Sequence, residues 1–225
     1  FDDSGQDVTS KWLRGRKADG SLNLGNSDNN TGFNPFWWGA DYTETNAFNM
    51  AVSVPQDGLG LANLYGGRDQ LADKLDTIFT TDGGYIGYGA MDGVGGIHEQ
   101  REAREVKLGQ YGHSNQPSHH IPYMYLYSSR PWETQKYVRD ILARCYAGST
   151  FGQGYIGDED NGEMSAWYVL SSIGFYPLSM GNDEFAIGSP QFEEVTVNLE
   201  GNKKLVIKAN NNSKKNVYVD SMYVN

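Results

Sequence analysis

Three consecutive acids interrupt the stretch GYIGDEDNGEMSAWYVL at residues 154–170. Asp158, Glu159 and Asp160 follow a glycine-rich turn and precede an apolar segment with the composition of a buried helix. A single acid in this position usually caps the helix, because the helix dipole and the free N–H groups of the first turn favour a negative charge. Three acids exceed what capping requires. Crowded carboxylates repel one another, so we expect one of them to have a raised pKa unless a cation lies nearby.

A second, distant carboxyl group is needed if these acids cleave a sugar bond. In glycoside hydrolysis one carboxyl protonates the leaving oxygen, while the other activates water or attacks directly. Glu44 is the best partner by context, because Trp37, Trp38 and Tyr42 surround it in FWWGADYTETNAF. An apolar setting raises the pKa of a carboxyl group and keeps it protonated, as an acid catalyst must be. The alternative is an exposed helix glutamate, with the aromatic rings packed in the core instead of stacked on a sugar.

A run of amides and imidazoles, HSNQPSHH, occupies residues 113–120 and holds three of the four histidines. A transition-metal site is the first interpretation, but His119 and His120 diverge on a helix, and the run has no H-x-x-x-H or HExxH spacing. The side-chain oxygens of Asn115 and Gln116 are hard ligands of the kind that Ca²⁺ prefers. A satisfied polar loop that closes a helix is the alternative.

Composition excludes several classes of function. The 225 residues carry a formal net charge of −10, which argues against a broad nucleic-acid surface but suits uncharged sugars and a bound cation. No run is long and apolar enough to span a bilayer, and the first residues do not have the pattern of a signal peptide. The single cysteine, Cys145, leaves no internal disulfide. The chain begins at Phe1, so we expect a mature or trimmed piece of a longer protein.

Helical patterns joined by glycine-rich loops dominate residues 1–180. In the segment 66–80, Leu71, Leu75 and Ile78 fall on one face at helical spacing. The segment 161–175 is apolar nearly all round, and we expect it to be deeply buried. The expected helices are 41–52, 66–80, 100–109, 117–129 with a bend or restart at Pro122, 131–146 and 161–175. The arrangement indicates an α/α toroid with its function on the loops at one end.

Residues 181–225 have a different pattern and form the second predicted domain, a small antiparallel β region. Apolar and polar residues alternate there between turn signals, as in half-buried strands. A hairpin turn is expected at residues 199–203. The expected strands are EFAIGSP, EEVTVNLEG, KKLVIKAN and KNVYVDSMYVN.

Together these segments resemble glycoside hydrolase family 92, the calcium-dependent exo-α-mannosidases. The resemblance runs in order through most of the chain, and its last three blocks are the most specific. The matching blocks are RGRKADGS (14–21), FWWGADYTETNAFNMAVSVPQD (36–57), HSNQPSHHIPYMY (113–125), PWETQKYVRDIL (131–142), GYIGDEDNGEMSAWYVLSSIGFYPLS (154–179) and FAIGSPQFEEVTVNL (185–199).

The resemblance implies a fold and a reaction. The family's catalytic domain is an (α/α)₆ barrel with β structure packed against it, of which this mainly α chain would supply the C-terminal half. The implied reaction is hydrolysis of terminal α-mannosides, in mannan or N-glycans, with inversion of configuration. By position in the family's blocks, Glu44 corresponds to the general acid and Asp160 to the general base. Asp158 corresponds to the residue that assists the base.

The resemblance also implies the binding groups. His98 and Glu99 match a pair that contacts the leaving mannose in members with α-1,2 preference. The family's Ca²⁺ bridges the sugar's O2 and O3 to protein oxygens, for which Asn115 and Gln116 are the candidates. The remaining candidates for contact with the substrate are Trp37, Trp38 and Asp41.

Two departures keep alternatives open. Many members read N-E-P where this chain has Asn115, Gln116 and Pro117, so the site loses a formal charge. Family enzymes are also several times longer, so we expect a missing N-terminal part of the same protein as partner. By resemblance alone, the location is periplasmic or secreted. The alternatives are a non-catalytic sugar-binding or scaffold fragment, and a member that cleaves other α-mannosidic links or mannosyl phosphodiesters.

Overall fold

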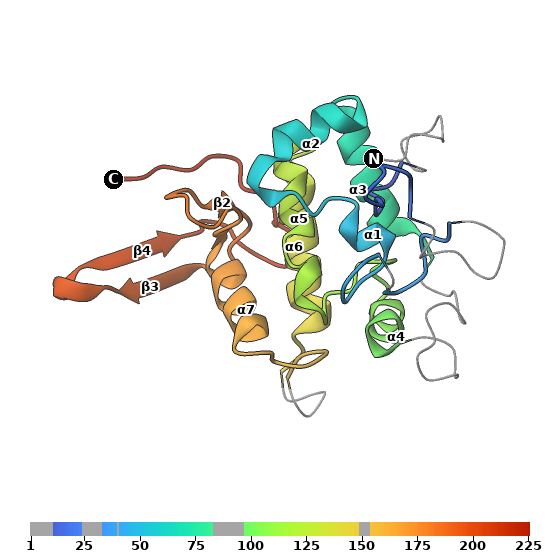
Figure 1. Ribbon diagram of the computed structural model, residues 1–225. Coiled ribbons are helices and arrows are strands. Elements are labelled where there is room, and N and C mark those ends of the chain that lie inside the picture. Colours follow the sequence, from blue (N-terminus) through green and yellow to red (C-terminus); the bar gives the residue numbers. More distant parts are fainter. Residues whose placement is uncertain (1–10, 24–32, 40, 83–96, 149–153) are drawn as a thin grey trace.

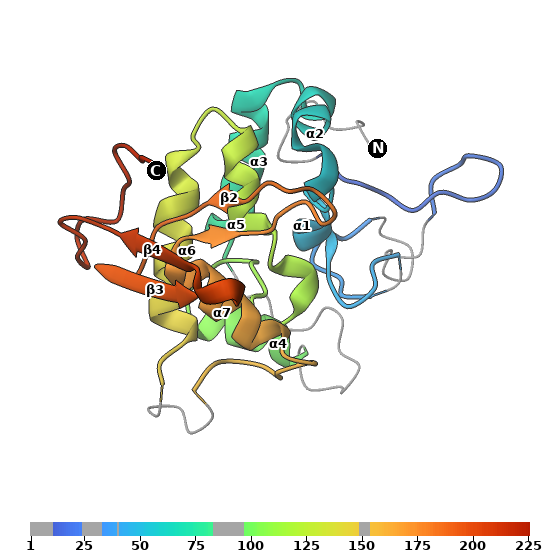
Figure 2. The ribbon, with the colours of Figure 1, turned by 90° about the vertical axis from the view of Figure 1, so that its left-hand side faces the viewer.

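The computed structural model describes residues 11–23, 33–39, 41–82, 97–148 and 154–225. It shows a helical body from which a β hairpin projects (Figure 1). Helices α5 and α6 run side by side in both ribbon views, and α7 packs on α6 (Figure 2). None of the helices in these ranges combines the length and apolar character that a membrane crossing requires. The helices are α1 (Ala47–Met50), α2 (Gly58–Tyr65), α3 (Arg68–Thr80), α4 (His98–Glu105), α5 (Ile121–Met124), α6 (Trp132–Cys145) and α7 (Glu163–Ile173).

Most of the expected helices are confirmed within a few residues. The helices α3, α4, α6 and α7 lie within a few residues of the segments expected at 66–80, 100–109, 131–146 and 161–175. The segment 117–129 divides into the 3₁₀ turn Gln116–Ser118, helix α5, which restarts around Pro122, and the 3₁₀ turn Tyr125–Tyr127. Helix α2, which follows the 3₁₀ turn Pro55–Asp57, is not among the expected helices.

The helix expected at 41–52 is wrong for its first half. Residues 41–45 form turns, and Glu44 has a left-handed φ of 56°. Helix α1 begins only after Asn46, whose side-chain oxygen accepts a hydrogen bond from the Asn49 N–H at 3.2 Å. An Asn at this position caps a helix more readily than it continues one. The candidate acid Glu44 therefore lies on a loop.

The core forms where α3 and α6 present their apolar stripes. Leu71, Leu75, Ile141 and Leu142 are at most 1% exposed. Fully burying such a side chain contributes about 1.5–3 kcal/mol each to the free energy of unfolding. The ring of Phe79 stacks on that of Tyr137 with centroids 3.9 Å apart, which joins the two helices.

Helix α7 is buried on one face only, so the expectation that it is buried all round is wrong. Met164 and Trp167 are fully buried, and the Trp167 indole N–H donates to the His119 carbonyl at 3.1 Å. On the other face Ala166 is exposed and Val169 is 55% exposed. An apolar composition predicts that a helix face seeks cover, but it does not say which element supplies it.

Within the described residues, the strands form two antiparallel pairs. Strand β1 (Phe175–Tyr176) pairs with β2 (Ala186–Ile187), and β3 (Glu194–Asn198) pairs with β4 (Lys204–Lys208). The turn expected at 199–203 closes the second pair through a 3₁₀ turn at Glu200–Asn202. The first pair lies on both sides of residue 181, where the sequence suggests a domain boundary. The division into two domains stays a prediction.

The strand expected in KNVYVDSMYVN is wrong, because this segment joins no sheet of the described residues. Two side chains satisfy part of its backbone instead. The Val219 N–H donates to Gln135 Oε1 at 2.8 Å, and the Val217 carbonyl accepts from Ser189 Oγ at 2.5 Å. Alternation makes a strand possible, but pairing requires a neighbouring edge.

A pair of truncations tests this assignment of buried and exposed helix faces. We expect Ile141→Ala in α6 to lower the free energy of unfolding by about 2–5 kcal/mol, since it leaves a cavity in the core. The matched change Val169→Ala on the outer face of α7 should alter it by less than about 0.5 kcal/mol. Urea unfolding followed by circular dichroism measures both. Equal losses in the two variants would contradict the assignment.

Candidate active site

Two loops that are far apart in the sequence touch at Gly157. Its φ is 75°, and a Cβ placed on it would lie 2.5 Å from Ser114 Cβ and 2.7 Å from the Ser114 carbonyl oxygen. A side chain is therefore excluded by both conformation and space. This contact places Asn115 and Gln116, which follow Ser114, beside the three acids.

The two amide side chains bind one carboxylate each. Asn115 Nδ2 donates to the Glu44 carbonyl at 2.7 Å and lies 3.4 Å from Glu44 Oε2. Gln116 Nε2 donates to Asp160 Oδ2 at 2.8 Å. The structure therefore brings Glu44 and Asp160, from distant parts of the chain, to one dipeptide.

The three adjacent acids have different environments. Glu159 caps α7 by accepting from the Ser165 N–H at 3.0 Å and from Ser165 Oγ at 2.6 Å. Hydrogen bonds from Ser165, and a further one from Tyr155, lower the pKa of Glu159. For this residue the shift is opposite to the rise expected from crowding, because hydrogen-bond donors stabilise its charged form.

Neither Asp158 nor Asp160 caps the helix, so that alternative is wrong. Gly162 occupies the N-cap position of α7. Asp160 has a left-handed φ of 45° and directs its carboxylate to Gln116. Asp158 is exposed, and none of the described side chains donates a hydrogen bond to its carboxylate. Both aspartates therefore remain accessible to a ligand.

Glu44 is exposed in this chain, contrary to the apolar setting expected from the neighbouring aromatic residues. Of the three aromatic residues, Tyr42 is buried, whereas Trp37 and Trp38 are only partly so. The turn at 41–45 directs Tyr42 into the core, where its hydroxyl donates to the Leu13 carbonyl at 2.9 Å. Adjacent residues in a turn face different environments, so the aromatic block does not enclose the acid.

His98 and Glu99 form a pair at the start of α4, close to Glu44. His98 Nε2 lies 3.2 Å from Glu99 Oε1, and His98 Nδ1 lies 3.3 Å from Glu102 Oε1. Glu99 lines a small pocket with Trp38. Burial raises the pKa of Glu99, and the charges of Glu102 and Glu44 raise it further, while His98 lowers it.

Asp41 holds the segment 14–23 in place. The Asn23 amide donates to its carboxylate, and a Cβ at Gly15 would lie 2.7 Å from that carboxylate. Asp41 therefore has a structural contact of its own. Its contact with a substrate stays a prediction.

The three histidines of the loop use their ring nitrogens in protein contacts. His113 accepts from the Tyr111 hydroxyl at 2.7 Å and donates to the Tyr146 hydroxyl at 2.8 Å. This assignment suits a neutral ring, because the Tyr146 hydroxyl donates in turn to the Met164 carbonyl at 3.1 Å. Burial holds the pKa of His113 well below its ordinary value.

The other two rings point in different directions. His119 Nε2 donates to the His113 carbonyl and its Nδ1 faces Glu163 Oε1, both at 3.0 Å. His120 Nε2 donates to the Val52 carbonyl at 3.1 Å. The three rings therefore brace the loop that carries Asn115 and Gln116.

The dipeptide Asn115–Gln116 offers side-chain oxygens of the kind that could bind a hard cation. The side-chain oxygens of Asn115 and Gln116 accept no hydrogen bond from the described residues, and the carboxylates of Glu44 and Asp160 lie alongside. Oxygen donors of this kind suit Ca²⁺. No group of three His, Cys, Asp or Glu side chains within these ranges could hold a metal.

Sequence reasoning missed several residues that build the site. Gly157 had a visible signal, since it directly precedes the acids. Tyr146 and Glu163 had none, because each acts through a partner distant in the sequence. Tyr111 lies only two residues from His113, but the sequence does not show that the two side chains meet.

The model of the glycosyl hydrolase family 92 catalytic domain matches residues 1–225. The family GH92 α-mannosidase BT3965 of Bacteroides thetaiotaomicron, in complex with mannoimidazole, has 33% identity and a TM-score of 0.76, over 94% of this chain and 26% of that one. The inverting mannosidase BT2199 of the same organism has 35% identity and a TM-score of 0.70, over 92% of this chain and 26% of that one.

A third relative is a protein of Arthroderma benhamiae named as an uncharacterized secreted glycosidase. It is 26% identical over 175 residues, which are 76% of this chain and 19% of that protein. The chain therefore spans about a quarter of the solved relatives and a fifth of this one.

The contact between the loops yields a test with a matched control. We expect Gly157→Ala to lower the free energy of unfolding by at least about 1 kcal/mol more than Gly162→Ala, since only the first change also creates an overlap. Both glycines have positive φ, but a Cβ at Gly162 would meet nothing within 4 Å. Urea unfolding measures the difference. Equal effects would show that the loops do not pack as described.

The environment of His120 predicts a pH dependence of stability. Burial lowers the pKa of His120 from 6.5 to about 4, so the unfolded chain takes up a proton that the folded chain rejects between these values. The free energy of unfolding should therefore fall as the pH falls through this window.

In the His120→Gln variant, which keeps an N–H donor, the loss should be smaller by up to about 1.4 kcal/mol per pH unit. Urea titrations at several pH values between 7 and 4 measure both slopes. Parallel slopes for wild type and variant would contradict the burial of this ring.

Proposed function

Because the chain belongs to glycosyl hydrolase family 92, we propose that it carries the acid and base of an α-mannosidase that releases terminal mannose with inversion. One observation supports this above the others: Asn115 and Gln116 hold Glu44 and Asp160 at a single dipeptide. Two carboxyl groups from distant loops, converging on one place, are what an inverting glycosidase requires. The solved relatives, an α-mannosidase bound to mannoimidazole and an inverting mannosidase, favour the same chemistry.

The proposed reaction is a single displacement. Glu44 donates its proton to the glycosidic oxygen as the bond from that oxygen to C1 breaks. Water attacks C1 from the opposite face of the ring, and Asp160 accepts the proton that the water loses. Asp158 is exposed nearby and assists Asp160 in orienting the water. Room for this water requires a separation of roughly 6.5–9.5 Å between the two carboxyl groups.

The proposed acid Glu44 lies on an exposed turn beside Glu99. The charge of Glu44 helps to raise the pKa of the Glu99 carboxyl, so the two acids are electrostatically coupled. Covering of this surface by substrate, and by further parts of a longer polypeptide, would strengthen the effect.

Calcium is the proposed cofactor, held by the side-chain oxygens of Asn115 and Gln116. When bound, it would supply a positive charge that polarises hydroxyl groups of the mannose ring. The amide nitrogens of the same side chains orient Glu44 and Asp160. The amide nitrogens of the dipeptide therefore position Glu44 and Asp160, while its amide oxygens remain available for the cation.

The substrate is a mannose-containing glycan with a proposed α-1,2 linkage, such as mannan or an N-glycan. His98 and Glu99 would contact the leaving mannose, and their position beside Glu44 and Trp38 supports this. Trp37, Trp38 and Asp41 complete the proposed set of binding groups. The partly exposed rings of the two tryptophans suit stacking on a sugar.

The chain is proposed to be the C-terminal part of a longer catalytic region. Residues 1–180 would form half of an (α/α)₆ barrel and residues 181–225 its β region, with the N-terminal part of the same protein as partner. This proposal is supported by the length of the solved relatives, because the chain spans only about a quarter of each of them. Export to the periplasm or the medium is also proposed, in line with the relative named as secreted.

Substitution of the two carboxyl groups tests the proposal on the complete polypeptide that contains this chain. We expect Glu44→Gln and Asp160→Asn each to lower kcat on an unactivated α-1,2-mannobiose by about 10²–10⁴-fold. The control Glu105→Gln, a carboxylate 75% exposed on α4, should keep wild-type turnover. Proton NMR of the wild-type reaction should show β-mannose first.

Release of α-mannose first would exclude inversion. Wild-type turnover in Glu44→Gln would remove Glu44 as the acid. A polypeptide that binds mannosides without cleaving any of them would favour a sugar-binding role instead.

A further inference from the structure

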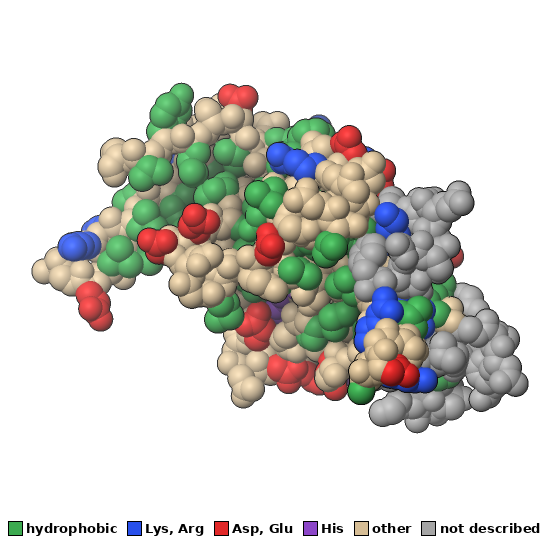
Figure 3. All heavy atoms as spheres, turned by 45° about the horizontal axis from the view of Figure 1, so that its top comes forward, with side chains coloured by type: hydrophobic (Ala, Val, Ile, Leu, Met, Phe, Trp, Pro, Cys, Tyr) green, Lys and Arg blue, Asp and Glu red, His purple; other side chains and the backbone are tan. Residues whose placement is uncertain are grey.

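Large apolar side chains reach the surface mainly at the C-terminal end of the chain. Within the described residues, ten of the fourteen exposed ones lie between residues 180 and 224, so the exposure is concentrated in one region. Figure 3 shows apolar atoms gathered on the side that carries this region. The ten are Met180, Phe185, Phe192, Leu199, Leu205, Val206, Tyr218, Met222, Tyr223 and Val224.

The hairpin β3–β4 is amphipathic in its observed register. Val195 lies opposite Ile207, and Val197 lies opposite Leu205. Side chains alternate between the two faces of a strand, so these four residues share one face, which we call the hairpin face. The other face is mostly polar and includes Glu194 and Lys208, whose charged groups lie 3.7 Å apart.

The hairpin face is only partly covered by the described residues. Leu205 is 40% exposed, and the other three side chains are only partly buried. An isolated two-stranded hairpin is marginally stable at best in water, and it becomes stable when its apolar face packs on something. The apolar and polar residues of this hairpin therefore alternate as in a sheet whose apolar face packs on another element, and the described residues supply only part of that packing.

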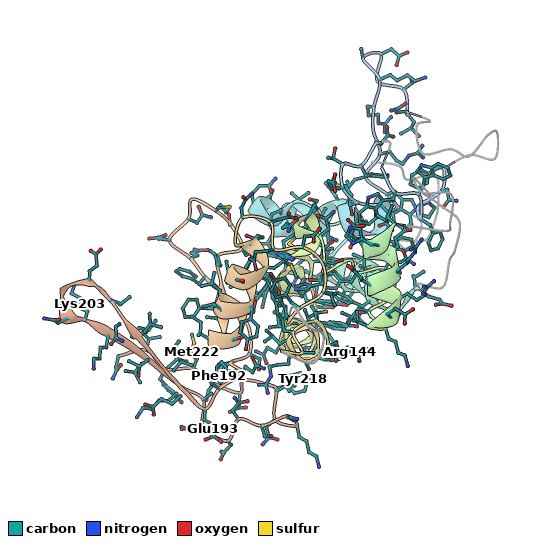
Figure 4. All side chains as sticks on the ribbon, turned by 90° about the horizontal axis from the view of Figure 1, so that it is seen from below. Arg144, Phe192, Glu193, Lys203, Tyr218 and Met222 are labelled. Atoms are coloured by element: carbon teal, nitrogen blue, oxygen red, sulfur yellow. The ribbon has the colours of Figure 1, made fainter. Side chains whose placement is uncertain are left out.

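The base of the hairpin is fixed to the helical body. Arg139 on α6 donates to the Pro190 carbonyl at 2.6 Å, to Asn212 Oδ1 at 2.7 Å and to the Ser213 carbonyl at 3.0 Å. The Gln191 N–H donates to the Ser172 carbonyl of α7 at 2.8 Å. From this base the strands extend away from the helices, with Lys203 at the far end (Figure 4). The face is thus presented in a set direction.

We propose that the hairpin face is a docking surface for an apolar sheet face in the part of the polypeptide that the longer relatives carry beyond the matched region. The solved relatives are about four times as long as the match, so they provide the chain length for such an element. This inference rests on the part of the proposed function that assigns the chain to a longer hydrolase. It does not depend on the roles of Glu44 and Asp160.

The size of the face favours an occupant on the same polypeptide over a second copy. Five residues at about 3.4 Å each, across two strands about 4.8 Å apart, give a footprint of roughly 170 Å². A stable interface between separate proteins buries about 800 Å² on each partner. A small contact suffices when both surfaces belong to one chain, because linkage raises the effective concentration to about millimolar. The net charge of −10 opposes an anionic lipid surface.

Cysteine labelling measures the cover directly. The sole native thiol, Cys145, is fully buried and its pKa is raised by burial, so a new surface cysteine reports alone. Val197→Cys probes the hairpin face, and Thr196→Cys, its neighbour on the polar face, is the matched control. In the isolated 225 residues Thr196→Cys, at an exposed position, should react with a maleimide no more than about threefold faster than Val197→Cys, at a partly buried one. In the complete gene product Val197→Cys should react at least about tenfold more slowly, and Thr196→Cys less than about twofold more slowly.

Equal labelling of the two positions in the complete gene product would overturn the proposal, including the case in which that product is these 225 residues alone. Protection in the isolated chain that increases with its concentration would also overturn it and would identify a second copy as the occupant. If Val197→Cys fails to fold, Leu205→Cys against Val206→Cys repeats the comparison on β4. Mannosidase activity with no protection would refute only the docking, and protection without activity would refute only the proposed reaction.

Discussion

The contact of Gly157 with Ser114 determines where the polar groups of the candidate site can meet. Because a Cβ at Gly157 would overlap Ser114, the two backbones approach as closely as they do only with glycine at this position. The next residues on one side are Asn115 and Gln116, and on the other side the acids 158–160. Two short amide side chains then bridge to Glu44 and Asp160 without any long or flexible connection. The arrangement of the site is therefore a consequence of how two loops pack.

A buried aromatic and histidine network keeps those loops in place. His113 lies between two tyrosine hydroxyls, one of which donates onward to the first turn of α7. His119 joins the same helix through Glu163 and Trp167. A charged imidazole would be costly in this dry environment, and burial lowers the pKa of His113 accordingly. The ring is therefore neutral, as its two hydrogen bonds to tyrosine hydroxyls require. Catalytic loops that rest on such a framework can be exposed to a ligand without losing their geometry.

The chain leaves two surfaces open, and they differ in chemical character. Around Glu44, Glu99 and Glu102 the open surface is acidic and polar, with His98 as a nearby partner. At the hairpin face it is aliphatic and lies on a sheet that Arg139 holds at its base. An acidic surface suits protons, cations and sugar hydroxyls, whereas an aliphatic face gains free energy only by losing contact with water. The molecule thus separates its chemistry from its association surface.

The sequence by itself determined the elements whose cause is local. The stripe of Leu71, Leu75 and Ile78 predicts α3, alternation around Val195 and Val197 predicts β3, and the ordered blocks identify the family. Tertiary structure alone decided that Glu159 caps α7 while Asp160 turns to Gln116, and that Glu44 lies on an exposed turn. It also decided that one face of α7 is exposed and that the residues after 215 join no sheet of the described chain. Periodicity and capping act within a few residues of backbone, so a sequence displays them. What a side chain meets depends on segments that are distant in the sequence and on packing, which no local pattern contains.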